Sequence, residues 1–274
     1  MILYRTKDGI VVDTGEEIVK IDEKWDSIIG ESNLTKEIDE MISRGEKQQS
    51  FHINDALVPV HSQEIWAAGV TYYRSRDARM AESEKSGGDS FYDRVYNADR
   101  PEIFFKGNHR TVVGANDSIS IRKDAHWNVP EPELVLLANA EGTLIGCTIG
   151  NDVSSRDIEG ENPLYLPQAK VYNRSCAIGP GILIGANIPS PETEIKLKIV
   201  REKNTIFSGT TNLSELKRKP SELLEYLFRD NNFPAGCYLM TGTGIIPPDE
   251  FTLVSGDIVS ITIEPIGNLI NQVM

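Results

Sequence analysis

Cysteine is scarce in this chain, with three in 274 residues, and long apolar runs are absent. Cys147, Cys176 and Cys237 are odd in number and far apart, so they predict neither a disulfide framework nor a paired-cysteine metal site. No apolar run approaches the roughly 20 residues that a membrane-spanning helix needs, and no leader-like segment stands near Met1. The protein is therefore predicted to be cytoplasmic, with buried and unreactive thiols.

Basic residues are also in short supply, because 28 lysines and arginines stand against 41 aspartates and glutamates, which gives a formal net charge of −13. Such a charge repels phosphate backbones and anionic headgroups, so we expect neither nucleic acid nor a membrane as a partner. Acidity instead favours divalent cations. Hydrophobic residues make up 39% of the chain, which is ordinary for a folded protein with one large domain and a small one.

The predicted elements change in character near residue 60. Before this point, two short strands flank a turn at residues 7–9, and apolar residues recur at helical spacing from about Leu34 to Arg44. After it, short apolar runs separated by glycine, proline and asparagine are typical of a β-rich domain rather than of alternating βαβ units. We therefore expect an α+β, β-rich fold, with a small N-terminal α/β domain at residues 1–60 and a catalytic domain at residues 61–274.

Three further elements are predicted in the β-rich part. Apolar residues alternate with lysines over residues 195–199, which indicates a half-buried strand, and a helix is expected from about Ser221 to Phe228. Residues 76–85 are polar, compatible with a helix and followed by two glycines. They predict either a mobile cover for a site or an ordinary exposed helix.

Carboxylates are concentrated in Glu131-Pro132-Glu133, which opens an apolar strand at residues 134–138. Residues two apart in a strand point to the same face, so the two glutamates would present their carboxylates together. A second strand ends at Asp152, and a hairpin would bring this aspartate beside them. Three hard oxygen donors without histidine or thiolate are typical of a magnesium, manganese or calcium site. The alternative is a solvated strand, because short Glu-x-Glu patterns are common there.

Several segments together resemble the fumarylacetoacetate hydrolase superfamily, in their order and their residues. They are Pro101–Lys106, Glu131–Leu134, Gly150–Asp157, Glu161–Gln168, Ala169-Lys170, Gly179–Gly181 and Thr241–Gly244. Within the superfamily, the resemblance is to dehydratases of 2-keto-3-deoxy sugar acids, and it spans roughly residues 65 to 274. It implies a fumarylacetoacetate hydrolase-like fold, a rolled mixed β-sandwich, and a homo-oligomer, either a dimer or a tetramer.

The resemblance also implies roles for five acidic and basic residues. Glu131, Glu133 and Asp152 would ligate the metal, Lys170 would lie beside the substrate, and Glu102 would be a catalytic carboxylate. A divalent cation that holds the carboxylate and carbonyl of a 2-oxo acid acidifies the C3 proton and stabilises the enolate. Lys170 and Glu102 would share the acid and base roles, in an order that the sequence leaves open. A surface position for Lys170 and a purely structural carboxylate at Glu102 are the alternatives.

The loop at residues 69–78 departs from the hydrolases of the family, which typically carry a histidine and a glutamate there to activate water. It contains no histidine, which disfavours hydrolysis and leaves elimination available. The loop does offer arginines, which are well shaped to bind a carboxylate or a sugar hydroxyl, or which belong to a solvated helix start. The predicted substrate contacts are Arg74, Ser75, Arg76, Ser154 and Thr243.

Three hypotheses follow for the function. The first is a magnesium-dependent hydro-lyase that removes water from a 2-keto-3-deoxy sugar acid, such as 2-keto-3-deoxy-D-arabinonate, to give 2,5-dioxopentanoate. The second is an acylpyruvate-type hydrolase, decarboxylase or isomerase of a small 2-oxo acid on the same metal site. The third is a non-catalytic binding module with a structural calcium ion. The stereochemistry at C4 stays open, because epimers differ only in the position of one hydroxyl.

Overall fold

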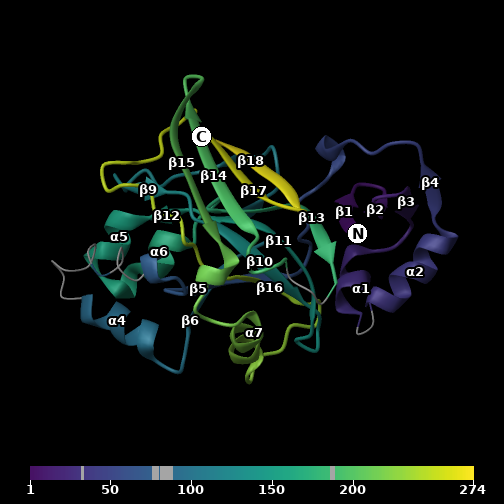
Figure 1. Ribbon diagram of the computed structural model, residues 1–274, viewed down its shortest axis with the longest axis horizontal. Helices are drawn as coiled ribbons and strands as arrows, with labels where there is room; N and C mark the ends of the chain where they lie inside the picture. The colour runs from purple at the N-terminus through teal and green to yellow at the C-terminus, as the bar shows by residue number, and fades with distance from the viewer. Residues whose placement is uncertain (32–33, 76–79, 81–88, 186–188) are drawn as a thin grey trace.

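The structure, a computed structural model, describes the chain except for residues 32–33, 76–79, 81–88 and 186–188 (Figure 1). Two packed β-sheets form its centre, with the N-terminal strands and helices at one end of the molecule and α4, α5 and α6 toward the other (Figure 1). The helices are α1 (Trp25–Gly30), α2 (Leu34–Arg44), α4 (Asp89–Asn97), α5 (Arg156–Glu161), α6 (Leu166–Lys170) and α7 (Pro220–Phe228). Short 3-10 helices are η1 (Ile53–Asp55), η3 (Pro163–Tyr165) and η4 (Leu213–Glu215).

The larger sheet contains most of the strands. They are β1 (Ile2–Thr6), β2 (Gly9–Asp13), β3 (Ile18–Ile21), β4 (Glu46–Gln48), β5 (Glu64–Gly69), β6 (Glu102–Asn108), β7 (Val112–Val113), β10 (Pro132–Ala138), β11 (Leu144–Asp152), β13 (Cys176–Ile184) and β16 (Cys237–Met240). Their order is β4-β3-β2-β1-β13-β11-β10-β16-β5-β6, with β7 also paired to β13. The β16–β5 and β13–β7 pairs are parallel and the others antiparallel, so the sheet is mixed.

The second sheet has the order β15-β14-β17-β18-β8. Its strands are β8 (Ser118–Ile119), β14 (Glu194–Arg201), β15 (Asn204–Asn212), β17 (Ile258–Ile263) and β18 (Gly267–Val273). A separate pair joins β9 (Asn128–Val129) to β12 (Ser154–Ser155). Along β14 every second residue is buried, because only one face of this strand meets the larger sheet. The α+β, β-rich prediction is confirmed, as are the helices at residues 34–44 and near 221–228.

Strand β10 explains how the core is organised, because it is buried on both faces. Leu134 and Leu136 join the cluster between the two sheets, with residues of β14 and β17, whereas Val135 and Leu137 join a cluster that includes α1 and the N-terminal strands. A continuous apolar run suits a strand covered on both sides. This rigid central strand and its neighbour β11 carry the predicted metal ligands at their ends.

The N-terminal residues do not form a separate sheet, since β1 pairs with β13 of the larger one. The proposed domain boundary at residue 60 stays a prediction. The helix expected over residues 76–85 falls on positions of which only Met80 is described. No helix in the described part of the chain is long and apolar enough to cross a bilayer.

Candidate metal centre and active site

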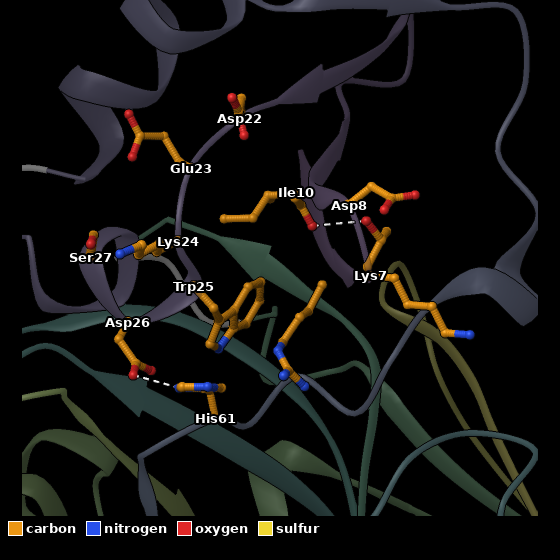
Figure 2. A pocket seen from close by; sticks show the side chains of 13 residues that line it. Lys7, Asp8, Ile10, Asp22, Glu23, Lys24, Trp25, Asp26, Ser27 and His61 are labelled. Atoms are coloured by element: carbon orange, nitrogen blue, oxygen red, sulfur yellow. Dashed lines mark hydrogen bonds and ion pairs between the residues drawn. The ribbon is translucent and has the colours of Figure 1, made fainter.

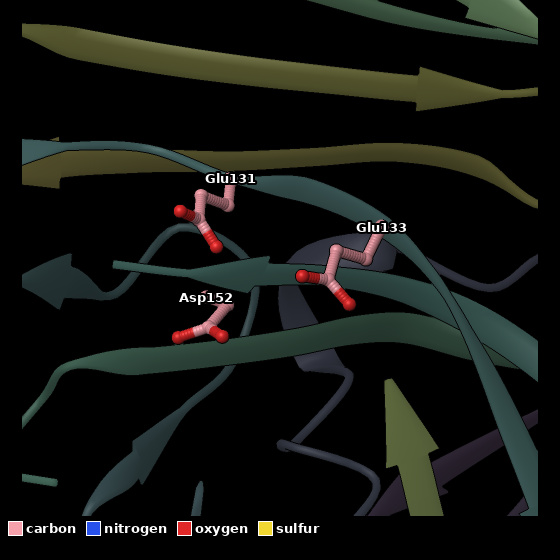
Figure 3. A group of neighbouring side chains, drawn as sticks. All are labelled: Glu131, Glu133 and Asp152. Carbon is pink, nitrogen blue, oxygen red and sulfur yellow. The ribbon is translucent and has the colours of Figure 1, made fainter. Parts of the chain in front are cut away.

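Three carboxylates converge where β10 begins and β11 ends (Figure 3). The antiparallel register places Glu133 opposite Gly150 and Pro132 opposite Asn151, and the Asp152 amide donates to the Glu131 carbonyl at 2.9 Å. One oxygen from each of Glu131, Glu133 and Asp152 lies within 4.8 Å of the others. All three side chains are buried, so the solvated-strand alternative is wrong.

Glu133 is the carboxylate whose charge is least compensated. Its Oε2 accepts a hydrogen bond from the Gly242 amide at 2.6 Å, and no described cation pairs with it. Burial, together with the charges of Asp152 and Glu131, raises the pKa of Glu133 well above its usual range, against the opposing effect of Lys170. A divalent cation would neutralise this charge, and three oxygen donors fit a hard ion such as Mg²⁺.

Lys170, the last residue of α6, is buried in contact with two of these carboxylates. Its Nζ donates to Glu131 Oε2 at 2.7 Å, to Asp152 Oδ2 at 3.1 Å and to Ser154 Oγ at 2.5 Å. The Phe104 ring centroid lies 5.8 Å from the same nitrogen. The surface alternative for Lys170 is therefore wrong, and its ammonium is held at a defined point beside the carboxylates.

Three further charged side chains complete the buried cluster, and sequence reasoning gave none of them a role. Lys106 Nζ lies 2.6 Å from Asp152 Oδ1, Arg156 Nη2 lies 2.8 Å from Glu131 Oε1, and Glu159 Oε1 lies 3.5 Å from Lys170 Nζ. In the described part of the site, four carboxylates thus face three cations. If all are ionised, one negative charge is left over, which favours binding of a cation.

Two spacing signals in the sequence point to these missed residues. Lys106 stands four residues after Glu102, a spacing that places two side chains on one face of a regular strand, although the pairing of β6 with β5 is irregular at Lys106. Arg156 and Glu159 are three residues apart on α5, which follows β12 shortly after the ligand strand β11, and so they meet on one side of the helix.

A small cavity of about 20 Å³ adjoins the cluster, which is room for roughly one water molecule or ion. Among the predicted substrate contacts, Ser75 and Thr243 line it. Ser154 lies next to Lys170, Arg74 is exposed and does not line the cavity, and Arg76 lies outside the described residues. Their roles stay predictions.

Glu102 lies at the start of β6, against Gly69 of the cavity wall. A methyl group on Gly69 would be 2.1 Å from Glu102 Oε2, so the carboxylate rests directly on this glycine. The next wall residue, Val70, has a φ of 53°, a left-handed conformation that is unusual for a β-branched residue and costs roughly 1–3 kcal/mol. Strained backbone of this kind is typical of functional sites.

A larger pocket of about 1060 Å³ lies in the N-terminal part, where Asp26 and His61 are joined at 2.7 Å (Figure 2). Its wall mixes acidic side chains, such as Asp22 and Glu23, with basic ones, such as Arg5 and Lys24. It shares no residue with the cavity beside the carboxylates. Size alone would select this pocket, but its mixed charges favour no class of ligand, whereas the carboxylate cluster has a defined chemistry.

Two curated proteins are similar to this chain over most of its length. The chain is 49% identical over 225 residues to a Haloferax volcanii protein named "Probable 2-keto-3-deoxyxylonate dehydratase", covering 82% of this chain and 76% of that one. It is 44% identical over 229 residues to the 2-dehydro-3-deoxy-D-arabinonate dehydratase of Saccharolobus solfataricus, covering 82% and 77%.

A solved structure of 2-keto-3-deoxy-D-arabinonate dehydratase, complexed with magnesium and 2,5-dioxopentanoate, superposes with a TM-score of 0.83 at 36% identity. It covers 99% of this chain and 97% of that one. The family model for the fumarylacetoacetate (FAA) hydrolase C-terminal region matches residues 65–274. These matches confirm the predicted fold, and the chain belongs to the fumarylacetoacetate hydrolase family.

Proposed function

We propose that this protein is a magnesium-dependent dehydratase, a hydro-lyase, of a 2-keto-3-deoxy sugar acid such as 2-keto-3-deoxy-D-arabinonate. The products are 2,5-dioxopentanoate and water. One observation carries the proposal: a buried lysine, Lys170, contacts Glu131 and Asp152 of the acidic cluster. The named activities of the two relatives and the magnesium and product in the solved dehydratase structure support it.

Glu131, Glu133 and Asp152 would hold the magnesium, with manganese or calcium as alternatives. Bound there, the ion would supply a Lewis acid that withdraws electrons from the 2-oxo acid end of the substrate. Lys170 is fixed by its contacts with two of these carboxylates, so its amine stays beside the same end of the substrate. Lys170 would accept a proton in its neutral form, which a divalent cation held by these carboxylates would favour.

The reaction requires one proton to leave C3 and the hydroxyl to leave C4 as water. We assign these transfers to Lys170, which lines the cavity from α6, and to Glu102 of β6, which rests against Gly69 of the cavity wall. The C3–C4 double bond that forms is then resolved in two proton transfers: a proton moves from C5 to C3, which gives a C4–C5 enol, and the enol loses its hydroxyl proton and gains one at C4, which produces the aldehyde. Two proton-transfer groups on opposite elements suit this sequence, because protons are handled at neighbouring carbons.

The remaining assignments are part of the same proposal. We place Arg74, Ser75, Arg76, Ser154 and Thr243 at the substrate. The resemblance to the family supports a homo-oligomer, and the ordinary acidic globular composition supports a cytoplasmic location. The names of the relatives support a place in pentose catabolism.

The direct test incubates purified protein and magnesium with 2-keto-3-deoxy-D-arabinonate, its C4 epimer, an acylpyruvate and oxaloacetate. We expect an aldehyde from one of the two sugar acids, trapped as a hydrazone, and no aldehyde after the metal is chelated. Absence of aldehyde from both sugar acids would refute the dehydratase proposal. Turnover of the acylpyruvate or of oxaloacetate alone would favour the hydrolase, decarboxylase or isomerase alternative.

A further inference from the structure

Lys106 is a fully buried lysine on β6, the last strand of the larger sheet, and the mechanism above does not use it. It has 0% exposure and lies on β6 two residues after Phe104, which lines the cavity, at the point where the pairing of β6 with β5 is irregular. Lysine is almost never fully buried unless it is paired. Its place between the cavity wall and the acidic cluster therefore requires an explanation.

The ammonium of Lys106 donates hydrogen bonds to two carbonyl oxygens and forms an ion pair with one carboxylate oxygen. Nζ lies 2.6 Å from Asp152 Oδ1 and donates to the Val153 carbonyl at 3.1 Å and to the Lys170 carbonyl at 2.5 Å. These acceptors lie at the end of β11, just after it, and on the last residue of α6. One side chain thus joins the strand that carries a metal ligand to the helix that carries the proposed proton-transfer group.

The two oxygens of Asp152 are divided between two lysines. Lys106 contacts Oδ1 and Lys170 contacts Oδ2, so the plane of the carboxylate is fixed from both sides. The Lys170 carbonyl is held by Lys106 and also by Ser175 Oγ at 2.9 Å. Without Lys106, the carboxylate could rotate about its last bond, and the end of α6 would lose one of its two anchors.

We propose that Lys106 is a positioning residue that fixes Asp152 and Lys170 relative to each other for metal binding and proton transfer. This inference rests on the proposed function. It predicts a change in magnesium affinity that is opposite in direction to the change expected from charge alone. Removing a cation near the site should tighten binding of Mg²⁺ by Coulomb's law, whereas releasing a metal ligand from its supporting contact should weaken it.

The test is Lys106→Met, which keeps the length of the side chain but removes its charge and its donors. Titration calorimetry of magnesium into substrate-free protein should give a Kd about 10–100-fold above wild type, as for the loss of other contacts that orient metal ligands. At saturating magnesium, kcat should also fall while KM changes less, because the Lys170 carbonyl loses one of the two side chains that hold it. Lys198→Met, on the exposed face of β14, is the matched control, and its magnesium Kd and its kcat should equal those of wild type.

Thermal unfolding must first show that Lys106→Met is folded. If it is not, Lys106→Arg preserves the charge, and its planar fork cannot reproduce three tetrahedral donors, so positioning again predicts weaker magnesium binding. A magnesium Kd at or below that of wild type, in whichever variant folds, would overturn the inference. Measurements on the wild-type protein distinguish failure of the proposed dehydratase function from failure of the proposed role of Lys106. Wild type that binds magnesium but forms no aldehyde refutes only the dehydratase, and wild type that binds no magnesium refutes both proposals.

Discussion

Replacing Gly69 with alanine is expected to reduce turnover strongly while leaving the fold and the metal site intact. The new Cβ would lie 2.1 Å from Glu102 Oε2 and 2.6 Å from its Cδ, whereas ordinary contacts begin near 3.4 Å. Gly69 is not in the left-handed region, so alanine fits its backbone. The clash therefore falls on the flexible end of Glu102, whose carboxylate must retreat from 2.1 Å to at least 3.4 Å.

A displacement of about 1 Å in a catalytic group can cost about 100-fold in rate, and we expect a fall in kcat of this order. An off-rotamer side chain costs only about 0.5–1.5 kcal/mol, so the protein should stay folded. Magnesium affinity should not change, because Glu102 is not among the three converging carboxylates.

The assay measures kcat for aldehyde formation and the magnesium Kd on the same preparation. Gly30→Ala is the control, because its Cβ would meet only the Pro234 carbonyl at 3.7 Å. Glu102→Gln should reduce kcat at least as much as Gly69→Ala does. A kcat for Gly69→Ala within threefold of wild type, with folding verified, would refute the catalytic role of Glu102.

Four further experiments test the metal centre and the residues around it. Magnesium at about 100 times its Kd should stabilise the protein by about 2.7 kcal/mol, seen as a higher melting temperature; an unchanged temperature would argue against the site. Glu133→Gln should abolish that rise, because a ligand with no described cation partner is lost, and a retained rise would contradict its assignment. Gly242→Ala should unfold at a lower temperature, since φ is +90° and the new Cβ would lie 2.0 Å from Thr71 Oγ1; wild-type stability would contradict this. Lys170→Met should lose turnover yet still bind magnesium in calorimetry, and substantial remaining turnover would exclude Lys170 from the proton transfers.

The sequence predicted those helices and strands that are specified by the spacing of apolar residues within the segment itself. The helix at Leu34–Arg44 has an apolar stripe, and β14 alternates lysines with buried residues, so each could be predicted from its own periodicity. The pairing of Glu131 with Glu133 follows from strand parity and needs no knowledge of the rest of the chain. Helix α1 was not predicted, because six residues are too few to show a helical periodicity. Its Trp25 and two isoleucines are buried against strands that are distant in sequence.

The buried cations could not be predicted in the same way, because their partners are distant in sequence. Lys170 contacts Glu131 across 39 positions and Asp152 across 18, and Lys106 reaches the Lys170 carbonyl across 64. A lysine in isolation is expected at the surface. Only the fold shows that these ammonium groups are enclosed by the carboxylates, and that no cation among the described residues forms an ion pair with Glu133.

This arrangement of charges bears on the choice between an enzyme and a structural calcium site. A site that serves only to retain a cation gains from carboxylates and loses from any ammonium group in contact with them. Here Lys170 touches two of the three carboxylates and is itself buried, which weakens metal binding and costs desolvation energy. A lysine that is held at a defined point beside a bound substrate can, however, take part in proton transfer. The contact that is unfavourable for storing a metal is therefore the one that elimination chemistry requires, and it favours the enzyme.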